Sequence, residues 1–181
     1  MIILGLDLAT QSGFCYGRPD TVPHAGSVKA PSSGKDLGVF GEFYFNYFWT
    51  LLDGLAARLE GDEGITIIYE APILPGQTNL ATTRKLHGLG LLLETVAILH
   101  PAPTAIFETH LQSIKKELAG KGDAQKSEMV LAARRCGITL PEGTEAFDAA
   151  DAFAAWLIAQ RKFAPEFNRM WDQRLYGGKI W

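Results

Sequence analysis

The sequence predicts an α/β domain: one five-stranded mixed β-sheet with helices on both faces. Short apolar runs at 2–8 and 65–69 are typical of buried strands. Between Lys35 and Glu60, apolar residues recur every three or four positions, which is the period of a helix. Strands and helices alternate after residue 35, and this favours a sheet whose helices pack on its faces. A length of 181 residues with 47% hydrophobic content is enough for one well-packed core.

The expected elements follow one another without long gaps. They are strands at 2–8, 13–17 and 24–29, a helix within 35–60, a strand at 65–69, a helix at 79–100, a strand at 104–107, and helices at 109–118, 124–136 and from 144 onward. The first three strands indicate an antiparallel meander. Pro101 and Pro103 end the long helix, and Thr109 and Asp123 are expected to cap the next two.

Four acidic residues stand where a two-metal nuclease needs them. Asp7 and Glu70 each close an apolar strand, and in α/β sheets the functional crevice lies at the carboxyl ends of strands. Asp148 and Asp151 are three residues apart, so a helix places both carboxylates on one face. Buried carboxylates are costly unless a cation balances them. Mg²⁺ prefers oxygen ligands, and two such ions can clamp a phosphodiester, so the pattern predicts phosphoryl chemistry on a nucleic acid.

The charge distribution is compatible with a nucleic-acid partner, although the net charge is −3. Without the four proposed ligands, the 17 basic residues slightly outnumber the remaining acids. Basic residues gather in one segment, which contains Lys115, Lys116, Lys121, Lys126, Arg134 and Arg135. Two bound divalent cations would also make the site electropositive. Local charge is therefore more informative here than the whole-chain value.

Each candidate also has a plainer interpretation. Asp favours turns after strands, so Asp7 could be a turn residue, and Glu70 could be an exposed strand end. The helix dipole favours acids such as Asp148 and Asp151 in a first turn. The same dipole disfavours Lys126 at a helix start, which points instead to a phosphate contact made together with backbone N–H groups.

Other side chains have two open interpretations as well. Solvated helix faces explain four basic residues at least as well as phosphate contacts do: Arg84, Lys85, Lys115 and Lys116. Phe43, Phe45 and Trp49 exceed one helix face and could serve either the core or a partner surface. His110, close to the last predicted strand, could approach the site.

Several protein classes are not expected. No apolar run approaches the roughly 20 residues of a membrane span, and Asp7 interrupts the N-terminal apolar stretch, so neither a membrane protein nor a signal peptide is predicted. Cys15 and Cys136 lie far apart without CxxC spacing, which argues against zinc and for a reducing cytoplasm.

The motifs resemble those of one known family. They are Ile3-Leu4-Gly5-Leu6-Asp7, Ile68-Tyr69-Glu70, Gly122-Asp123-Ala124-Gln125-Lys126-Ser127 and Asp148-Ala149-Ala150-Asp151-Ala152. In this order the set resembles the RuvC-type Holliday-junction resolvases, which have an RNase H-like fold. The resemblance covers the chain to about residue 162. It implies a nuclease domain at 1–163 and a C-terminal extension at 164–181 without a counterpart.

The resemblance implies a Mg²⁺-dependent endonuclease that resolves branched DNA, usually as a homodimer that cuts two opposed strands. Two Mg²⁺ ions, with Mn²⁺ as an alternative, would be held by Asp7, Glu70, Asp148 and Asp151. One ion, on Asp7 and a helical aspartate, would activate water, and the other, on Asp7 and Glu70, would stabilise the leaving 3′ oxygen. The products would carry 5′-phosphate and 3′-hydroxyl ends. The setting would be the DNA-associated cytoplasm of a bacterial or phage-infected cell.

The implied DNA contacts extend beyond the metal ligands. Lys126, which also counts as catalytic, and Lys115 would contact the scissile or adjacent phosphate. The whole set is Lys126, Lys115, Lys116, Lys121, Arg84, Lys85 and Ile73. Two departures indicate a divergent, phage-type member: Leu8-Ala9 replaces the usual Pro-Gly, and Ile73 replaces an aromatic residue that helps to open the junction.

Three other functions remain open. Residues 7–13 also resemble the first phosphate loop of sugar-kinase or actin-like ATPases, but those proteins need two lobes and a second phosphate loop. Another RNase H-like nuclease, acting on RNA–DNA hybrids or single strands, is the second alternative. The third is a non-catalytic protein that binds branched DNA and has structural acids.

A homodimer is expected through the helix at 79–100. Its apolar run exceeds what one core face requires, and its small residues would allow close approach: Leu86, Leu89, Gly90, Leu93, Val96 and Ala97. Two opposed cuts also call for two sites related by a two-fold axis.

Overall fold

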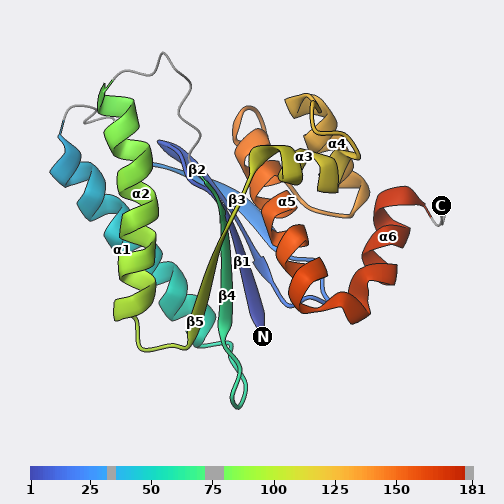
Figure 1. The fold of residues 1–181 in the computed structure, drawn as a ribbon, viewed down its shortest axis with the longest axis horizontal. Helices are drawn as coiled ribbons and strands as arrows, with labels where there is room; N and C mark the ends of the chain where they lie inside the picture. Colours follow the sequence, from blue (N-terminus) through green and yellow to red (C-terminus); the bar gives the residue numbers. More distant parts are fainter. Residues whose placement is uncertain (32–35, 72–79, 178–181) are drawn as a thin grey trace.

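The computed structural model describes residues 1–31, 36–71 and 80–177, which form a sheet between two layers of helices (Figure 1). The strands are β1 (Ile2–Asp7), β2 (Gln11–Gly17), β3 (His24–Lys29), β4 (Ile65–Glu70) and β5 (Thr104–Thr109). The helices are α1 (Leu37–Ala56), α2 (Leu80–Leu99), α3 (Leu111–Ala119), α4 (Lys126–Arg135), α5 (Glu145–Phe163), a 3₁₀ turn (Pro165–Phe167) and α6 (Asn168–Tyr176). The predicted five-stranded α/β architecture is confirmed.

The sheet is mixed, with the strand order β3-β2-β1-β4-β5. β1, β2 and β3 form the predicted antiparallel meander, and β4 and β5 run parallel to β1. Because parallel strands end at the same edge, Asp7 and Glu70 reach the same end of the sheet. Their positions follow from the pairing of Leu6 with Tyr69 and of Glu70 with Thr109.

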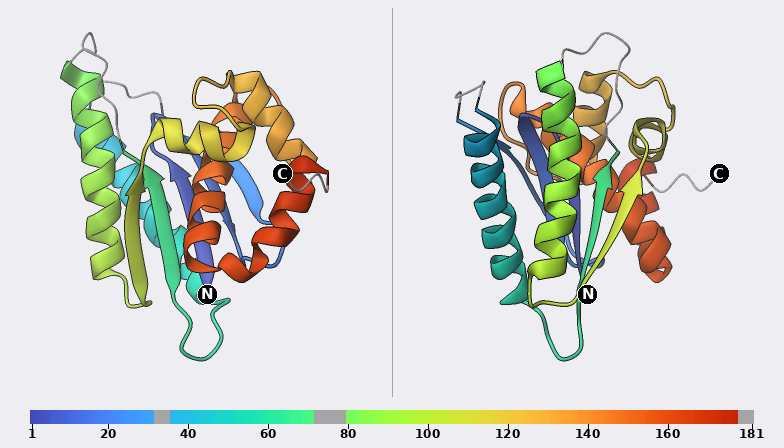
Figure 2. Two further views of the ribbon diagram at one scale, coloured as in Figure 1. Left: turned by 45° about the vertical axis from the view of Figure 1, so that its right-hand side comes forward. Right: turned by 60° about the vertical axis from the view of Figure 1, so that its left-hand side comes forward.

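Helices cover both faces of the sheet, as predicted (Figure 2). α1 and α2 pack on one face, where alternate strand residues such as Leu4, Leu6 and Ile67 are buried. The other strand residues, including Ile3 and Ile68, meet α5, with α3, α4 and α6 packed around that helix. The side chains of Phe43, Phe45 and Trp49 pack partly buried against the first core, which confirms their core interpretation.

The backbone of α5 lies directly on β1 and β2. A Cβ atom on Gly5 would be 2.4 Å from the carbonyl oxygen of Ala152, and one on Gly13 would be 1.9 Å from that of Asp148. The contacting face of α5 is rich in alanine, and Ala149 and Ala152 are fully buried. Glycine in the strands and alanine on the helix together allow this approach. The contact fixes the height of Asp148 above the sheet.

The C-terminal extension contributes a helix to the second core. Trp171 of α6 is fully buried, its ring centroid lies 5.1 Å from that of Trp156, and its Nε1 donates a 2.8 Å hydrogen bond to the carbonyl of Pro19. Arg161 of α5 bridges to Asp172 at 2.6 Å. The described part of residues 164–181 therefore packs against α5 and the β2–β3 turn.

Two predicted N-caps are wrong. His110 caps α3, because Thr109 continues β5 in the ladder with β4, where its carbonyl accepts from the N–H of Ala71 at 2.8 Å. Gln125 caps α4 instead of Asp123, since Gln125 and Glu128 form a reciprocal capping box. Helix ends depend on such local hydrogen bonds, so shifts of one or two residues are expected.

The helix α2 uses its predicted dimer residues differently. The chain's own sheet buries Leu89, Leu93, Val96 and Ala97. The prediction that this apolar run is more than one core face requires is therefore wrong. The exposed apolar side chains of α2 are others, described below. Ile73 and the polar loop at 75–79 lie outside the described residues. Among the described helices, none has the length and hydropathy needed to cross a membrane.

Gly13→Ala should destabilise the fold, because the new Cβ atom meets the backbone of α5 and one of the two elements must shift. Overpacking of this kind typically costs about 1–3 kcal/mol, equivalent to a melting temperature lower by roughly 2–12 °C for a chain of this size. Gly41→Ala in α1 is the matched control. A Cβ atom there has nothing within 4 Å, so that helix should gain up to about 1 kcal/mol. Equal melting temperatures for the Gly13 variant and the native chain would contradict this packing.

Candidate active site

The sheet edge at the ends of β1 and β4 brings two of the predicted acids together. Asp7 and Glu70 are the last residues of these neighbouring parallel strands, and both side chains are half-buried. The apolar residues before them are buried, which anchors each strand and fixes the position of its terminal carboxylate. This part of the site follows directly from the strand pattern of the sequence.

The other two acids come from α5. Asp148 and Asp151 lie in its first two turns, are half-buried, and share the face that the helix turns toward the sheet edge. Their neighbours Ala149, Ala150 and Ala152 are buried in the contact with the strands. The predicted pairing on one helical face is present, and the close packing of α5 carries both carboxylates to the strand ends.

The carboxylates influence one another electrostatically. Burial and then the charges of Glu70, Asp151 and Asp148 hold the pKa of Asp7 well above its usual range. Burial, followed by repulsion from Asp151, raises the pKa of Glu70 to about 7. Burial raises the pKa of Asp151 to about 6, with Asp148 adding to the shift and Lys126 opposing it. The four predicted ligands therefore form one interacting group.

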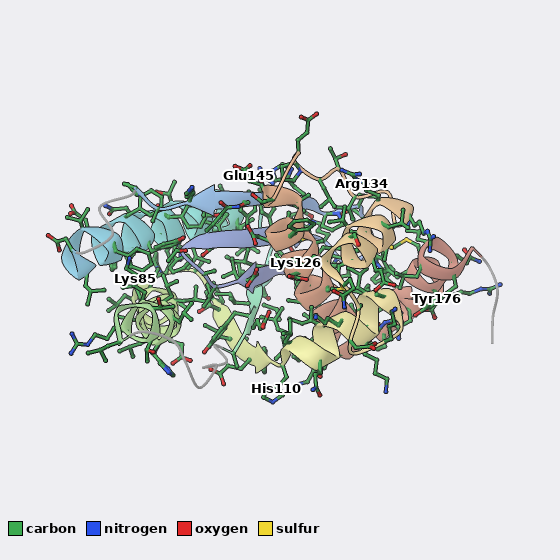
Figure 3. All side chains as sticks on the ribbon, turned by 90° about the horizontal axis from the view of Figure 1, so that it is seen from above. Lys85, His110, Lys126, Arg134, Glu145 and Tyr176 are labelled. Carbon is green, nitrogen blue, oxygen red and sulfur yellow. The ribbon has the colours of Figure 1, made fainter. Side chains whose placement is uncertain are left out.

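Lys126 is the cation shared by this group. It is the first residue of α4, and its charge opposes the raised pKa of all four acids. Its Nζ lies 5.4 Å from the centroid of the Phe147 ring at the start of α5. Viewed onto the strand ends, Lys126 lies centrally, between α3 and α5 (Figure 3). The structure thus places this lysine beside the carboxylates.

Lys115 of α3 also acts on the group, since its charge lowers the pKa of Glu70 and Asp151. The other predicted DNA contacts lie elsewhere. Lys121 forms a 2.8 Å ion pair with Glu128. Lys116 is exposed on the last turn of α3.

The basic residues of α2 belong to the opposite helical layer. Arg84 is exposed, and Lys85 lies over the ring of Phe40, 5.1 Å from its centroid. Figure 3 shows Lys85 beside α1 and α2, away from Lys126, with His110 at the rim where β5 meets α3.

Sequence reasoning missed Gln11. Its side-chain amide donates a 2.7 Å hydrogen bond from Nε2 to Oδ2 of Asp148. Burial raises the pKa of Asp148, and this hydrogen bond opposes the shift. The available signal was the position of Gln11, four residues after Asp7 and just before the strand predicted at 13–17. Its partner is 137 residues away, and only the tertiary structure reveals it.

The turn between β1 and β2 was missed as well. The hydroxyl of Tyr44, from α1, lies 3.0 Å from the carbonyl oxygen of Ala9 and 3.2 Å from that of Thr10. Ser12 Oγ donates to the Ala9 carbonyl at 2.7 Å and accepts from the Ala9 N–H at 3.1 Å. These bonds hold the turn that follows Asp7 and from which Gln11 projects.

The donor set suits a hard divalent cation, because four half-buried carboxylates offer oxygen ligands and are poorly balanced by two lysines. Burial is the main cause of their raised pKa values, and repulsion from other acids of the set adds to it for Asp7, Glu70 and Asp151. In the described parts of the chain, no three His, Cys, Asp or Glu side chains are arranged closely enough to hold an ion as they stand. Ligation would therefore require side-chain movements that bring the carboxylates together. The metal ligands therefore stay a prediction.

The fold is similar to those of two solved proteins, RuvC and a yeast mitochondrial Holliday junction resolvase. Thermus thermophilus RuvC has a TM-score of 0.60 at 20% identity, over 90% of this chain and 95% of that protein. The same protein in complex with a Holliday junction substrate has a TM-score of 0.62 at 20% identity, over 93% and 96%. The chain has a RuvC-type, RNase H-like fold. The yeast mitochondrial Holliday junction resolvase Ydc2 has a TM-score of 0.56 at 12% identity, over 93% of this chain and 83% of its own.

The likeness extends over nearly the whole chain but is not visible in sequence comparison. No protein-family model matches the sequence, and no curated protein matches it. At 20% identity or less, the superposition establishes the fold, and the chemistry has to be argued from the residues.

The raised pKa values predict how stability depends on pH in the metal-free protein. The unfolded chain ionises Glu70 and Asp151 near their ordinary values of 4.5 and 3.8, below the folded values of about 7 and about 6. The folded state therefore holds more protons between these limits, and its stability falls as pH rises through this window. Thermal unfolding in chelator should occur several degrees lower at about pH 8 than at about pH 5.

The double variant Glu70→Gln, Asp151→Asn is expected to reduce that pH dependence, while Glu142→Gln, at an exposed acid, should leave it in place. Adding Mg²⁺ at the higher pH should restore the melting temperature of the native chain. If the metal-free protein instead becomes more stable as pH rises through this range, the pKa values of these carboxylates are not raised in the folded state.

Proposed function

We propose that this chain is a Mg²⁺-dependent endonuclease that resolves Holliday junctions or other branched DNA by paired nicks. The observation that carries the proposal is the gathering of Asp7, Glu70, Asp148 and Asp151 at one edge of a RuvC-type sheet, with Lys126 beside them. One of the two similar solved proteins is a mitochondrial Holliday junction resolvase. The other, RuvC, was solved in complex with a Holliday junction substrate.

The four carboxylates would hold two Mg²⁺ ions, and Asp7, whose pKa all three other acids raise, would serve both. When bound, two such ions activate a water nucleophile and stabilise the leaving oxygen of a phosphodiester. The protein supplies a fixed frame for this chemistry. β1 and β4 are anchored in the core, and α5 is held by backbone contact, so the backbone that carries the four acids is fixed in place.

Lys126 would bind a phosphate oxygen next to the carboxylates. It stands at the N-terminus of a ten-residue helix, where the helix dipole favours an anion. Its ammonium group would neutralise charge that develops on the phosphate during displacement. Lys115 would contribute at longer range from α3. The exposed lysines and arginines of α3 and α4 would follow the DNA backbone away from the site.

Asp7→Asn and Glu70→Gln should each abolish cleavage while junction binding is retained or becomes tighter. Ligand charge is needed for the metals, whereas DNA affinity depends on basic residues and is opposed by nearby acids. The measurement is Mg²⁺-dependent nicking of a synthetic four-way junction, run beside linear duplex, single strand and RNA–DNA hybrid. If the protein cuts the hybrid or the single strand preferentially, that nucleic acid rather than the junction is its substrate. A near-native rate in either variant would contradict the metal assignment.

Lys126→Ala should lower the single-turnover cleavage rate at least about tenfold, or about 1.4 kcal/mol of barrier, even at saturating DNA. It should also flatten the salt dependence of junction binding by about one unit of slope. Lys116→Ala is the matched control, since that lysine is exposed and no effect of its charge on the four acids is seen in the described residues. Small, equal effects of the two changes would reduce Lys126 to one member of a diffuse basic face.

Two opposed cuts require two active sites, and we propose a homodimer that uses the outer face of α2. This face exposes apolar side chains that a monomer leaves in water: Leu91 is 69% exposed, Ile98 81% and Leu99 60%. Gly88, on the same side, has open space around its Cα, which would allow close approach of a second helix. A two-fold axis through such a patch would make the contact self-complementary.

Ile98→Glu should weaken the dimer, because a carboxylate would be buried at the contact without a partner. Leu131→Glu on α4 is the control, since Leu131 is 52% exposed but lies in the opposite layer. Light scattering with and without junction DNA measures the assembly. A native chain that stays monomeric in both conditions would refute the dimer.

A further inference from the structure

Gln11 and Asp148 are joined across the site by a short hydrogen bond between two rigid elements. Gln11 is the first residue of β2 and pairs with Lys29 of β3, while Ser12 beside it is buried and bonded to the preceding turn. Asp148 is held on the other side, because its backbone lies against Gly13. The backbone at each end of the 2.7 Å bond is therefore held in place, by the sheet at Gln11 and by the contact with Gly13 at Asp148.

The bond is selective for one oxygen of the carboxylate. An ionised carboxylate only accepts hydrogen bonds, so the Gln11 amide must present its NH₂ group, and that group binds Oδ2. Within the described part of the chain, Oδ1 of Asp148 receives no hydrogen bond, and neither oxygen of Asp151 does. The two aspartates of α5, which are equivalent in the sequence pattern, are therefore unequal in the structure.

We propose that Gln11 is a positioning residue that orients Asp148 as a metal ligand, holding Oδ2 and leaving Oδ1 for the cation. The inference rests on the proposed function and adds to it a residue outside the four motifs that resemble those of the resolvases. A neutral amide suits this task, because a lysine or arginine would compete with the cation for charge. Gln11 would also keep Asp148 from turning toward solvent while the site is empty. Asp151, without such a donor, remains free to offer both oxygens.

Outer hydrogen-bond partners of metal ligands commonly change metal affinity by roughly tenfold to a hundredfold when removed. Gln11→Ala should therefore weaken Mn²⁺ binding to the DNA-free protein by at least about tenfold, measured by calorimetry. Gln11→Glu should also weaken Mn²⁺ binding, because this variant keeps the size of the side chain but replaces the hydrogen-bond donor with a second carboxylate that faces Asp148. Thr10→Ala, at the exposed neighbour in the same turn, is the control and should bind Mn²⁺ as the native chain does.

A double-mutant cycle separates positioning from a general structural role. If Gln11 acts through Asp148, then Gln11→Ala should have no further effect on Mn²⁺ affinity in an Asp148→Asn background. Junction affinity in chelator should be unchanged by Gln11→Ala, whereas single-turnover cleavage at limiting Mn²⁺ should fall and recover at high Mn²⁺.

The outcomes distinguish this inference from the function on which it rests. Native Mn²⁺ affinity in Gln11→Ala, or an equal loss in both backgrounds of the cycle, would overturn the role of Gln11 and leave the nuclease proposal intact. A native chain that binds no divalent cation, with or without DNA, would overturn both.

Discussion

The contact between the backbone of α5 and the strands β1 and β2 is the constraint on which the site depends. It exists because Gly5 and Gly13 have no side chains where the carbonyls of Ala152 and Asp148 approach. The alanine-rich face of α5 lets the helix sit lower on the sheet than a face of larger residues could. This depth determines whether the helical aspartates reach the strand carboxylates. If α5 lay farther from the sheet, the same four acids would form two separate pairs, one on the strands and one on the helix.

The gathered carboxylates place an electrostatic cost on the fold. Each acid is half-buried and disfavours the ionisation of another, and the two nearby lysines offset only part of this effect. The two hydrophobic cores must supply the compensating stability, and their large buried aromatic side chains, such as Trp156, Trp171 and Tyr44, contribute much of it. Functional sites commonly hold such unfavourable arrangements, since the ligand that relieves them is also the one they are built to bind.

The two helical layers have different roles. The α1–α2 layer stabilises the turn after Asp7 through Tyr44 and leaves apolar side chains of α2 exposed to solvent. The layer of α3 to α6 supplies the helical aspartates and both lysines that act on the site. α6 supports this layer from behind, because Trp171 packs against Trp156 of α5. The helical aspartates and the proposed dimer surface thus lie on opposite sides of one sheet.

The sequence by itself determined the strands, the long helices and the four acids. Apolar runs and helical periods are local signals, and a carboxylate that closes a buried strand is visible without knowledge of its neighbours. The fold, the mixed sheet and the shared face of Asp148 and Asp151 follow from those signals. Cap positions were wrong by a residue or two, because Gln125 and Glu128 satisfy the helix start in a way that propensity alone does not reveal.

Only the tertiary structure decided which side chains meet. Gln11 and Asp148 are 137 residues apart, and Tyr44 reaches the turn at Ala9 from another layer, so no local pattern could connect them. It also decided which face of α2 is exposed, because an apolar helix with residues such as Leu89 and Leu91 can bury either side until the sheet selects one. Long-range packing chose Leu89 for the core and left Leu91 in solvent.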